Sequence, residues 1–174
     1  MNLEVFENME APDLRKYIKF LLWHYRLVDA FWFLNVVERY DQSVAEHINE
    51  QVWWRIGERS AKDLVTSFQI KEKGLKGFVK AIRYQPSSIN LEYDIQAKSD
   101  EVIISVPSCP PQVARKKRGM GEFVCKEMHQ GFFERFIREI DEQIKFECIF
   151  APPDPHPEDM FCKWRFYLAE DSDA

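Results

Sequence analysis

The chain has 174 residues, of which 45% are hydrophobic, 14% aromatic and 30% charged, with a formal net charge of −5 at pH 7. This length and apolar content predict a single domain over residues 1–174 with one core. The acidic balance argues against a nucleic-acid or anionic-membrane binder, because those partners attract basic surfaces. There is no membrane-length apolar run and no basic-then-apolar leader, so a cytoplasmic location is expected.

The N-terminal part, residues 1–86, is predicted to be helical. Pro12 suits the first turn of a helix, and apolar residues then recur at helical spacing without a Gly or Pro. Ser43 and Glu46 form a capping-box pattern that opens a second long helix. The expected helices cover residues 14–40, 44–68 and 77–84.

The C-terminal part, residues 87–169, is predicted to form a sheet, and the tail 170–174 is expected to fray. Alternating apolar and polar residues indicate a hairpin that pairs Ala97 with Val102. The expected elements are strands 89–97 and 102–106, a loop over 109–121, a helix over 123–143, and strands 144–150 and 161–168. The predicted fold class is therefore α+β, with long N-terminal helices packed on a four-stranded antiparallel sheet and a helix between strands 2 and 3.

Four cysteines in a reducing compartment are better interpreted as thiols or metal ligands than as disulfides. If the last two strands form a hairpin with Phe146 opposite Trp164, then Cys148 lies opposite Cys162 on the core face. The inward stripe of the preceding helix begins with Cys125. Three thiols are therefore expected to meet under the sheet.

A thiolate cluster of this kind favours zinc, which accepts three or four sulphur ligands with His or a carboxylate completing the set. The preferred ligands are Cys125, Cys148 and Cys162. The fourth position is open among Cys109, His156, Asp154 and His129. An iron–sulphur cluster is less favoured because the spacings match no ferredoxin pattern. The alternative is that all four are ordinary buried cysteines.

Two resemblances bear on this site. The order of elements over residues 89–168 resembles the vinyl-4-reductase-like ligand-binding domains, some of which are aromatic sensors of bacterial transcription activators. That resemblance implies a structural zinc on Cys125, Cys148 and Cys162, with Glu147 or Asp154 as acidic ligand. The chain lacks that family's closely paired cysteines in the last loop.

Four strings are similar to a small prokaryotic family grouped with proteins named L-2-amino-thiazoline-4-carboxylic acid hydrolases, and this resemblance extends over nearly the whole chain. They are Trp23-His24-Tyr25-Arg26, Cys109-Pro110-Pro111-Gln112, Gly119-Met120-Gly121-Glu122-Phe123-Val124-Cys125 and Cys162-Lys163-Trp164-Arg165-Phe166. A shared family name does not by itself establish a reaction.

The first helix carries polar residues inside an aromatic stretch, which suggests a pocket for a small molecule. The candidate ligand-binding residues are His24, Trp23, Trp32 and Asp29. Alternatively, His24 is a satisfied structural histidine and Asp29 pairs with a nearby arginine.

The leading functional hypothesis is a metal-stabilised domain that binds a small aromatic or apolar molecule, as a sensor or carrier, and dimerises through its long helices. The alternative is a hydrolase of a small amide or heterocycle. It would use either a metal-assisted reaction or a nucleophilic Cys109 or Cys125 with His129 or His24 as base.

Overall fold

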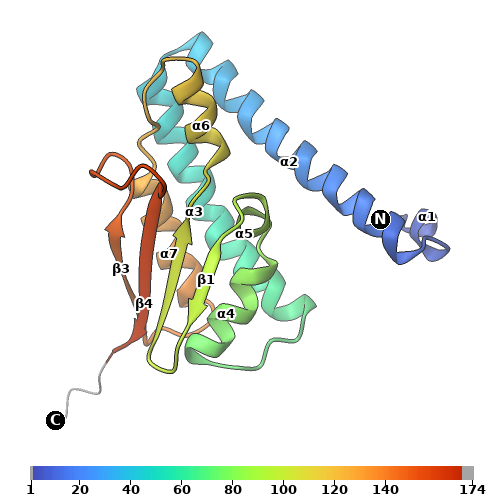
Figure 1. The fold of residues 1–174 in the computed structure, drawn as a ribbon. Coiled ribbons are helices and arrows are strands. Elements are labelled where there is room, and N and C mark those ends of the chain that lie inside the picture. The colour runs from blue at the N-terminus through green and yellow to red at the C-terminus, as the bar shows by residue number, and fades with distance from the viewer. Residues whose placement is uncertain (1, 170–174) are drawn as a thin grey trace. The chain divides into compact units, whose positions relative to one another are not determined.

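The computed structural model describes residues 2–169, which contain seven helices and four strands (Figure 1). The predicted α+β class is confirmed, and helices lie between β2 and β3 as expected. The tail 170–174, expected to fray, lies outside the described residues. The elements are α1 (Glu4–Glu7), α2 (Ala11–Arg39), α3 (Gln42–Ser67), α4 (Gly74–Tyr84), α5 (Pro86–Asn90), β1 (Asp94–Ala97), β2 (Glu101–Val106), α6 (Pro110–Lys117), α7 (Lys126–Arg138), β3 (Ile144–Phe150) and β4 (Cys162–Leu168).

The chain divides into two compact units, Met1–Ala45 and Glu46–Ala174. In the first unit, α2 is a 29-residue helix with Pro12 in its first turn, as predicted. The short helix α1 contacts it near its N-terminal end, where the rings of Phe6 and Tyr17 lie 4.9 Å apart. No residue of α2 is buried.

The start of α3 corrects the predicted capping box at Ser43 and Glu46. The helix begins at Gln42, and the backbone N–H of Val44 donates to Oδ1 of Asp41 at 2.8 Å. An aspartate that accepts from a first-turn N–H satisfies one of the donors left open at a helix start. Asp41 therefore performs the capping that the sequence pattern assigned to Ser43.

In the second unit, the four strands form an antiparallel sheet in the order β1-β2-β4-β3. Ala97 pairs with Val102, as the hairpin prediction required. Alternate residues of β2 and β4 are buried, and α4 and α7 cover that face (Figure 1). Phe78 of α4 and Phe133 of α7 place their rings 4.4 Å and 5.0 Å from that of Phe166. This face is the core of the unit.

Two segments differ from the predicted elements. Residues 86–90, partly assigned to a strand, form helix α5, because Pro86 occupies its first turn and the Gln85 side chain accepts from the Ser87 N–H. Residues 109–121, predicted as a loop, contain α6, with Cys109 as its N-cap and Pro110 in its first turn. The helix expected over 123–143 is shorter and covers Lys126–Arg138.

The register of the last hairpin also corrects the prediction. Phe146 lies opposite Phe166 and Cys148 opposite Trp164, two residues away from the predicted pairs. An irregularity between Cys148 and Phe150 interrupts the ladder, and a bulge adds a residue that strand alternation cannot reveal. A shift of two residues keeps every side chain on its predicted face.

Helices α3 and α7 approach each other closely at two glycines. A Cβ atom on Gly57 would lie 2.5 Å from the carbonyl oxygen of Phe132, and one on Gly131 would meet the indole of Trp54. Trp54 donates from Nε1 to the Glu127 carbonyl at 3.3 Å, and Trp53 places its ring 6.2 Å from that of Phe132. Both adjacent tryptophans of α3 therefore contact α7.

Candidate metal centre

The four cysteines come from four different elements of the second unit. Cys109 is the N-cap of α6, Cys125 the N-cap of α7, Cys148 lies in β3, and Cys162 begins β4. Cys125 and Cys162 are buried, and the other two are half-buried. None of the four, all of which lie within residues 2–169, forms a disulfide. Residues far apart in sequence thus bring sulphur atoms to the core of one unit.

The backbone around Cys125 is fixed by the loop that follows β3. The N–H groups of Cys125 and Lys126 donate to the carbonyl of Pro152 at 3.2 Å and 3.1 Å. His129, one turn later, places its Nδ1 3.0 Å from the Cys125 carbonyl. The first N–H groups of α7 are therefore used by the backbone and are not directed at a bound anion.

Gln112 of α6 links that helix to the segment before α7. Its amide accepts from the Phe123 N–H and donates to the Phe123 carbonyl, both at 2.7 Å. The same Nε2 lies 3.6 Å from Sγ of Cys125. Gln112 is buried, so its amide both positions the Cys125 segment and provides an N–H donor beside the sulphur.

Trp164 lies on the same face of β4 as Cys162. Its indole N–H is buried, and in the described part of the chain it has no acceptor at hydrogen-bonding geometry. The side chain is nevertheless close enough to Cys162 to lower the pKa of that thiol, against the larger raising effects of burial and of charge on Cys109. An N–H donor favours a thiolate over a neutral thiol, because a thiolate is the stronger acceptor.

Burial raises the pKa of the clustered thiols. It raises the pKa of Cys125 well above its ordinary value and that of Cys162 to about 12, and in each case a negative charge on Cys109 adds to the effect. Burial also raises the pKa of Tyr93, with charge on Cys162 as the next cause. Three cysteines and one tyrosine are therefore close enough for a charge on one to oppose ionisation of another.

Cys148 has different surroundings. Burial raises its pKa to about 11, and the nearby Lys126 ammonium opposes that rise. Nζ of Lys126 is 2.8 Å from Oδ2 of Asp154, and this pair lowers the pKa of the aspartate. Charge on Cys109 thus affects the pKa of both Cys125 and Cys162 more than charge on Cys148 does.

The other candidate ligands already have partners. His156 bonds to Glu122 through Nε2 at 3.0 Å and to the Pro157 carbonyl through Nδ1 at 2.8 Å. The Glu122 carboxylate raises the pKa of His156, whereas burial lowers that of His129. Glu147 pairs with Arg165 at 3.2 Å. Within residues 2–169, no three His, Cys, Asp or Glu side chains are arranged to hold a metal ion.

The four ligand-binding candidates on α2 do not converge on one point. Successive residues of a helix project about 100° apart, so Asp29 points about 120° away from Trp23 and about 140° away from His24. Nδ1 of His24 is 2.9 Å from the Phe20 carbonyl, and its ring lies 4.0 Å from the Phe20 ring. The guanidinium of Arg26 lies 5.0 Å from the Trp23 ring. A single ligand could touch a pair of these residues and not all four.

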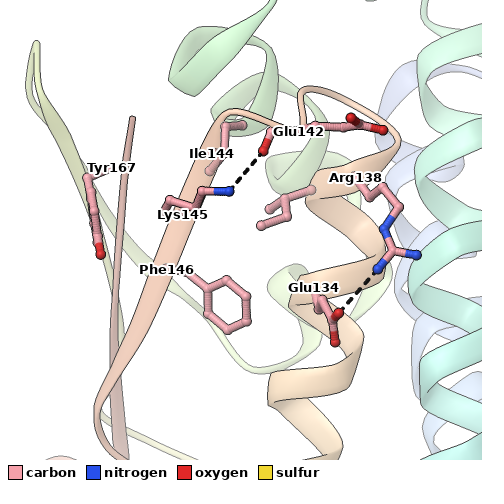
Figure 2. A pocket seen from close by; sticks show the side chains of 8 residues that line it. Glu134, Arg138, Glu142, Ile144, Lys145, Phe146 and Tyr167 are labelled. Carbon is pink, nitrogen blue, oxygen red and sulfur yellow. Dashed lines mark hydrogen bonds and ion pairs between the residues drawn. The ribbon is translucent and has the colours of Figure 1, made fainter. Parts of the chain in front are cut away.

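A surface hollow of about 590 Å³ lies beside β3 and the C-terminal turns of α7 (Figure 2). Lys145 donates to the Glu142 carbonyl at 3.4 Å, and Arg138 pairs with Glu134 at 3.1 Å. These charges are directed to the protein's own oxygens, and the hollow contains no cysteine. It is separate from the thiol cluster.

Sequence reasoning did not assign roles to Tyr93, Gln112 or Trp164. Tyr93 and Trp164 fit an apolar strand pattern, and that pattern gives no indication of a hydroxyl or an N–H beside a thiol. Gln112 is the last residue of the string that begins at Cys109. A glutamine three residues after a predicted ligand was the one available signal.

Comparison with known proteins gives a match to a family. Residues 14–168 match DUF6125, a family of unknown function. No curated protein matches the chain, and no link to vinyl-4-reductase-like domains or thiazoline hydrolases is found. None of the helices in residues 2–169 combines the length and hydropathy needed to cross a bilayer. The match spans well over half of the chain, and the protein therefore belongs to the DUF6125 family.

Proposed function

We propose that this DUF6125 protein is a metal-stabilised binding domain for a small aromatic or apolar molecule, acting as a sensor or carrier. In this proposal the cysteines of the second unit hold a zinc ion. The observation that supports it is that charge on Cys109 opposes ionisation of both Cys125 and Cys162, and that charge on Cys162 opposes ionisation of Cys125.

A bound cation would offset the repulsion between the thiolates. Neighbouring thiolates repel each other in a medium of low dielectric constant, whereas a divalent metal stabilises all of them together. The donors beside the sulphurs support the same state, since Gln112 Nε2 lies 3.6 Å from Cys125 Sγ and the Trp164 N–H acts on Cys162. A buried N–H without an acceptor costs about 1–3 kcal/mol, and a thiolate would relieve that cost.

Metal binding would require the side chains to move closer together. Zinc–sulphur bonds are about 2.3 Å long, and no three candidate ligands in residues 2–169 are arranged for a metal. Cys109 and Cys125 precede helices and Cys162 begins a strand, so each lies at the end of an element. Helix ends adjust more easily than helix interiors, which would allow the cluster to close.

The small-molecule part of the proposal depends on two further features. One is the aromatic content of α2, which offers pairs such as Trp23 with His24 or Asp29 with Trp32. The other is the resemblance of residues 89–168 to vinyl-4-reductase-like domains, which include sensors of aromatic molecules. A closed zinc site has a structural role and leaves no open position for chemistry.

The alternative, a cysteine-dependent hydrolase, receives less support. A nucleophilic cysteine needs a lowered pKa, and burial raises the pKa of Cys125. His129 does not offset this, since burial lowers its pKa and so disfavours the imidazolium that would stabilise a thiolate. A thiol in these surroundings is better suited to metal binding or to packing.

Alkylation of the native protein by iodoacetamide, with and without a chelator, tests the proposal. We expect slow labelling of all four thiols, a large acceleration by chelator and a matching fall in thermal stability. Cys162→Ala should abolish the chelator effect, whereas Ile149→Ala, at an exposed neighbour of Cys148, should keep it. One fast stoichiometric thiol that is indifferent to chelator would instead support the hydrolase.

A further inference from the structure

Helix α2 has more apolar surface than one neighbour can cover. Between residues 17 and 37 its only charged side chains are Lys19, Arg26 and Asp29. At 100° per residue these three fall within one sector of the helix, and apolar residues occupy most of the rest, with His24 and Asn35 as polar exceptions. The long helix therefore presents one polar side to water and apolar stripes elsewhere.

The first stripe follows a heptad pattern, with alternating spacings of four and three residues. This heptad stripe consists of Leu14, Ile18, Leu21, Tyr25, Val28 and Trp32. A second stripe, on the opposite side, consists of Phe20, Trp23, Leu27, Phe31 and Leu34.

We infer that the heptad stripe is the interface of a homodimer in which α2 pairs with α2 of a second copy in antiparallel orientation. This inference is independent of the metal proposal. A two-fold interface must be complementary to itself, and the heptad stripe contains no charged residue that would face its own copy. Apolar residues repeated at this spacing over six positions suit a helix–helix seam.

The charges beside the stripe favour the antiparallel orientation. When Leu14 packs against Trp32 of the second copy, Ile18 meets Val28 and Leu21 meets Tyr25. The residues that follow Leu14 and Val28 in sequence are Arg15 and Asp29. This register therefore brings Arg15 of each copy beside Asp29 of the other, which forms two symmetrical attractive pairs.

The apolar area suits a weak dimer. Five of the six stripe residues are between 38% and 67% exposed, and Trp32 is half-buried. Together they expose on the order of 500 Å² per copy, so burial of the whole stripe in both copies would remove about 1,000 Å² from water, at the low end for a specific interface. Apolar patches of this size often have a function.

Multi-angle light scattering of the full-length chain tests the interface. The wild type should have twice the single-chain mass of 20.8 kDa. Leu21→Glu should give the single-chain mass with an unchanged far-ultraviolet circular dichroism spectrum, and Lys19→Glu, in the polar sector, should leave the dimer intact. A wild-type mass of one chain, or a dimer that tolerates Leu21→Glu, overturns the inference.

A charge exchange tests the orientation without altering the apolar stripe. Arg15→Asp and Asp29→Arg should each weaken the dimer roughly tenfold, since each change places like charges together at two symmetrical positions. The double variant should restore the wild-type dissociation constant. Failure of the double variant to recover would overturn the antiparallel register. If the wild type is a monomer, flotation with vesicles of phosphatidylcholine and phosphatidylglycerol would identify a membrane surface as the occupant instead.

Discussion

The substitution Gly57→Ala tests the close contact between α3 and α7. In most exposed helices this change stabilises a protein by about 1 kcal/mol, because alanine has the higher helix propensity. Here the new Cβ would lie 2.5 Å from the Phe132 carbonyl oxygen and 3.2 Å from its carbonyl carbon. Real Cβ atoms essentially never approach another heavy atom within 3.0 Å. The backbone cannot rotate out of the way, so the helices must separate.

The expected net effect is a loss of about 1–3 kcal/mol. Overpacking typically costs about that much, and separation would also loosen the Trp53–Phe132 contact, so the propensity gain is outweighed. For a chain of this length, each kcal/mol lowers Tm by about 2–4 °C. Urea and thermal unfolding would measure the change, with Arg55→Ala at an exposed position of the same helix as the control.

Gly131→Ala should cost less than Gly57→Ala. Its new Cβ meets the indole of Trp54, and a side chain can rotate although it would lose its bond to the Glu127 carbonyl. Replacing Trp54 by leucine in the Gly131→Ala background should recover part of the loss. If Gly57→Ala stabilises the protein as an ordinary helical glycine would, the close approach of α3 and α7 is wrong.

Two further changes test the local interactions. Gln112→Ala should reduce the free energy of unfolding by about 2–4 kcal/mol, because it removes both hydrogen bonds between the Gln112 amide and the Phe123 backbone. An unchanged urea midpoint would contradict this. Glu101→Gln should lower Tm at pH 7 and have no effect well below pH 4. Hydrogen bonds from Lys98 and Arg165 lower the pKa of Glu101, so its stabilisation is present above the unfolded pKa and is lost as the pH falls through the folded value. Equal Tm differences at both pH values would refute that role.

The sheet was predictable because its signal is local. Alternation with period two identifies Val102 and Phe166 as core residues, and it fixes the face of each strand. It does not fix the register of two strands joined by a long loop, and Cys148 pairs with Trp164 and not with Cys162. Two prolines after Cys109 resembled a loop, whereas they occupy the first turn of α6, where a missing N–H costs nothing.

The thiol cluster was only partly predictable. Its location under the sheet follows from the inward-facing positions of Cys148 in β3 and Cys162 in β4, and from the position of Cys125 at the start of α7. The importance of Cys109 depends on α6, and α6 was not predicted. The roles of Gln112 and Trp164 depend on the directions of N–H groups in three dimensions. No spacing in the sequence encodes those directions.

Elemental analysis of untagged protein purified without added metal tests the proposed zinc site most directly. The wild type and Ile149→Ala should each contain one zinc per chain and no iron, and Cys162→Ala should contain neither metal. Wild-type protein that is folded, with its four thiols reduced and no bound metal, would contradict the account and leave the cysteines as packing residues of the core.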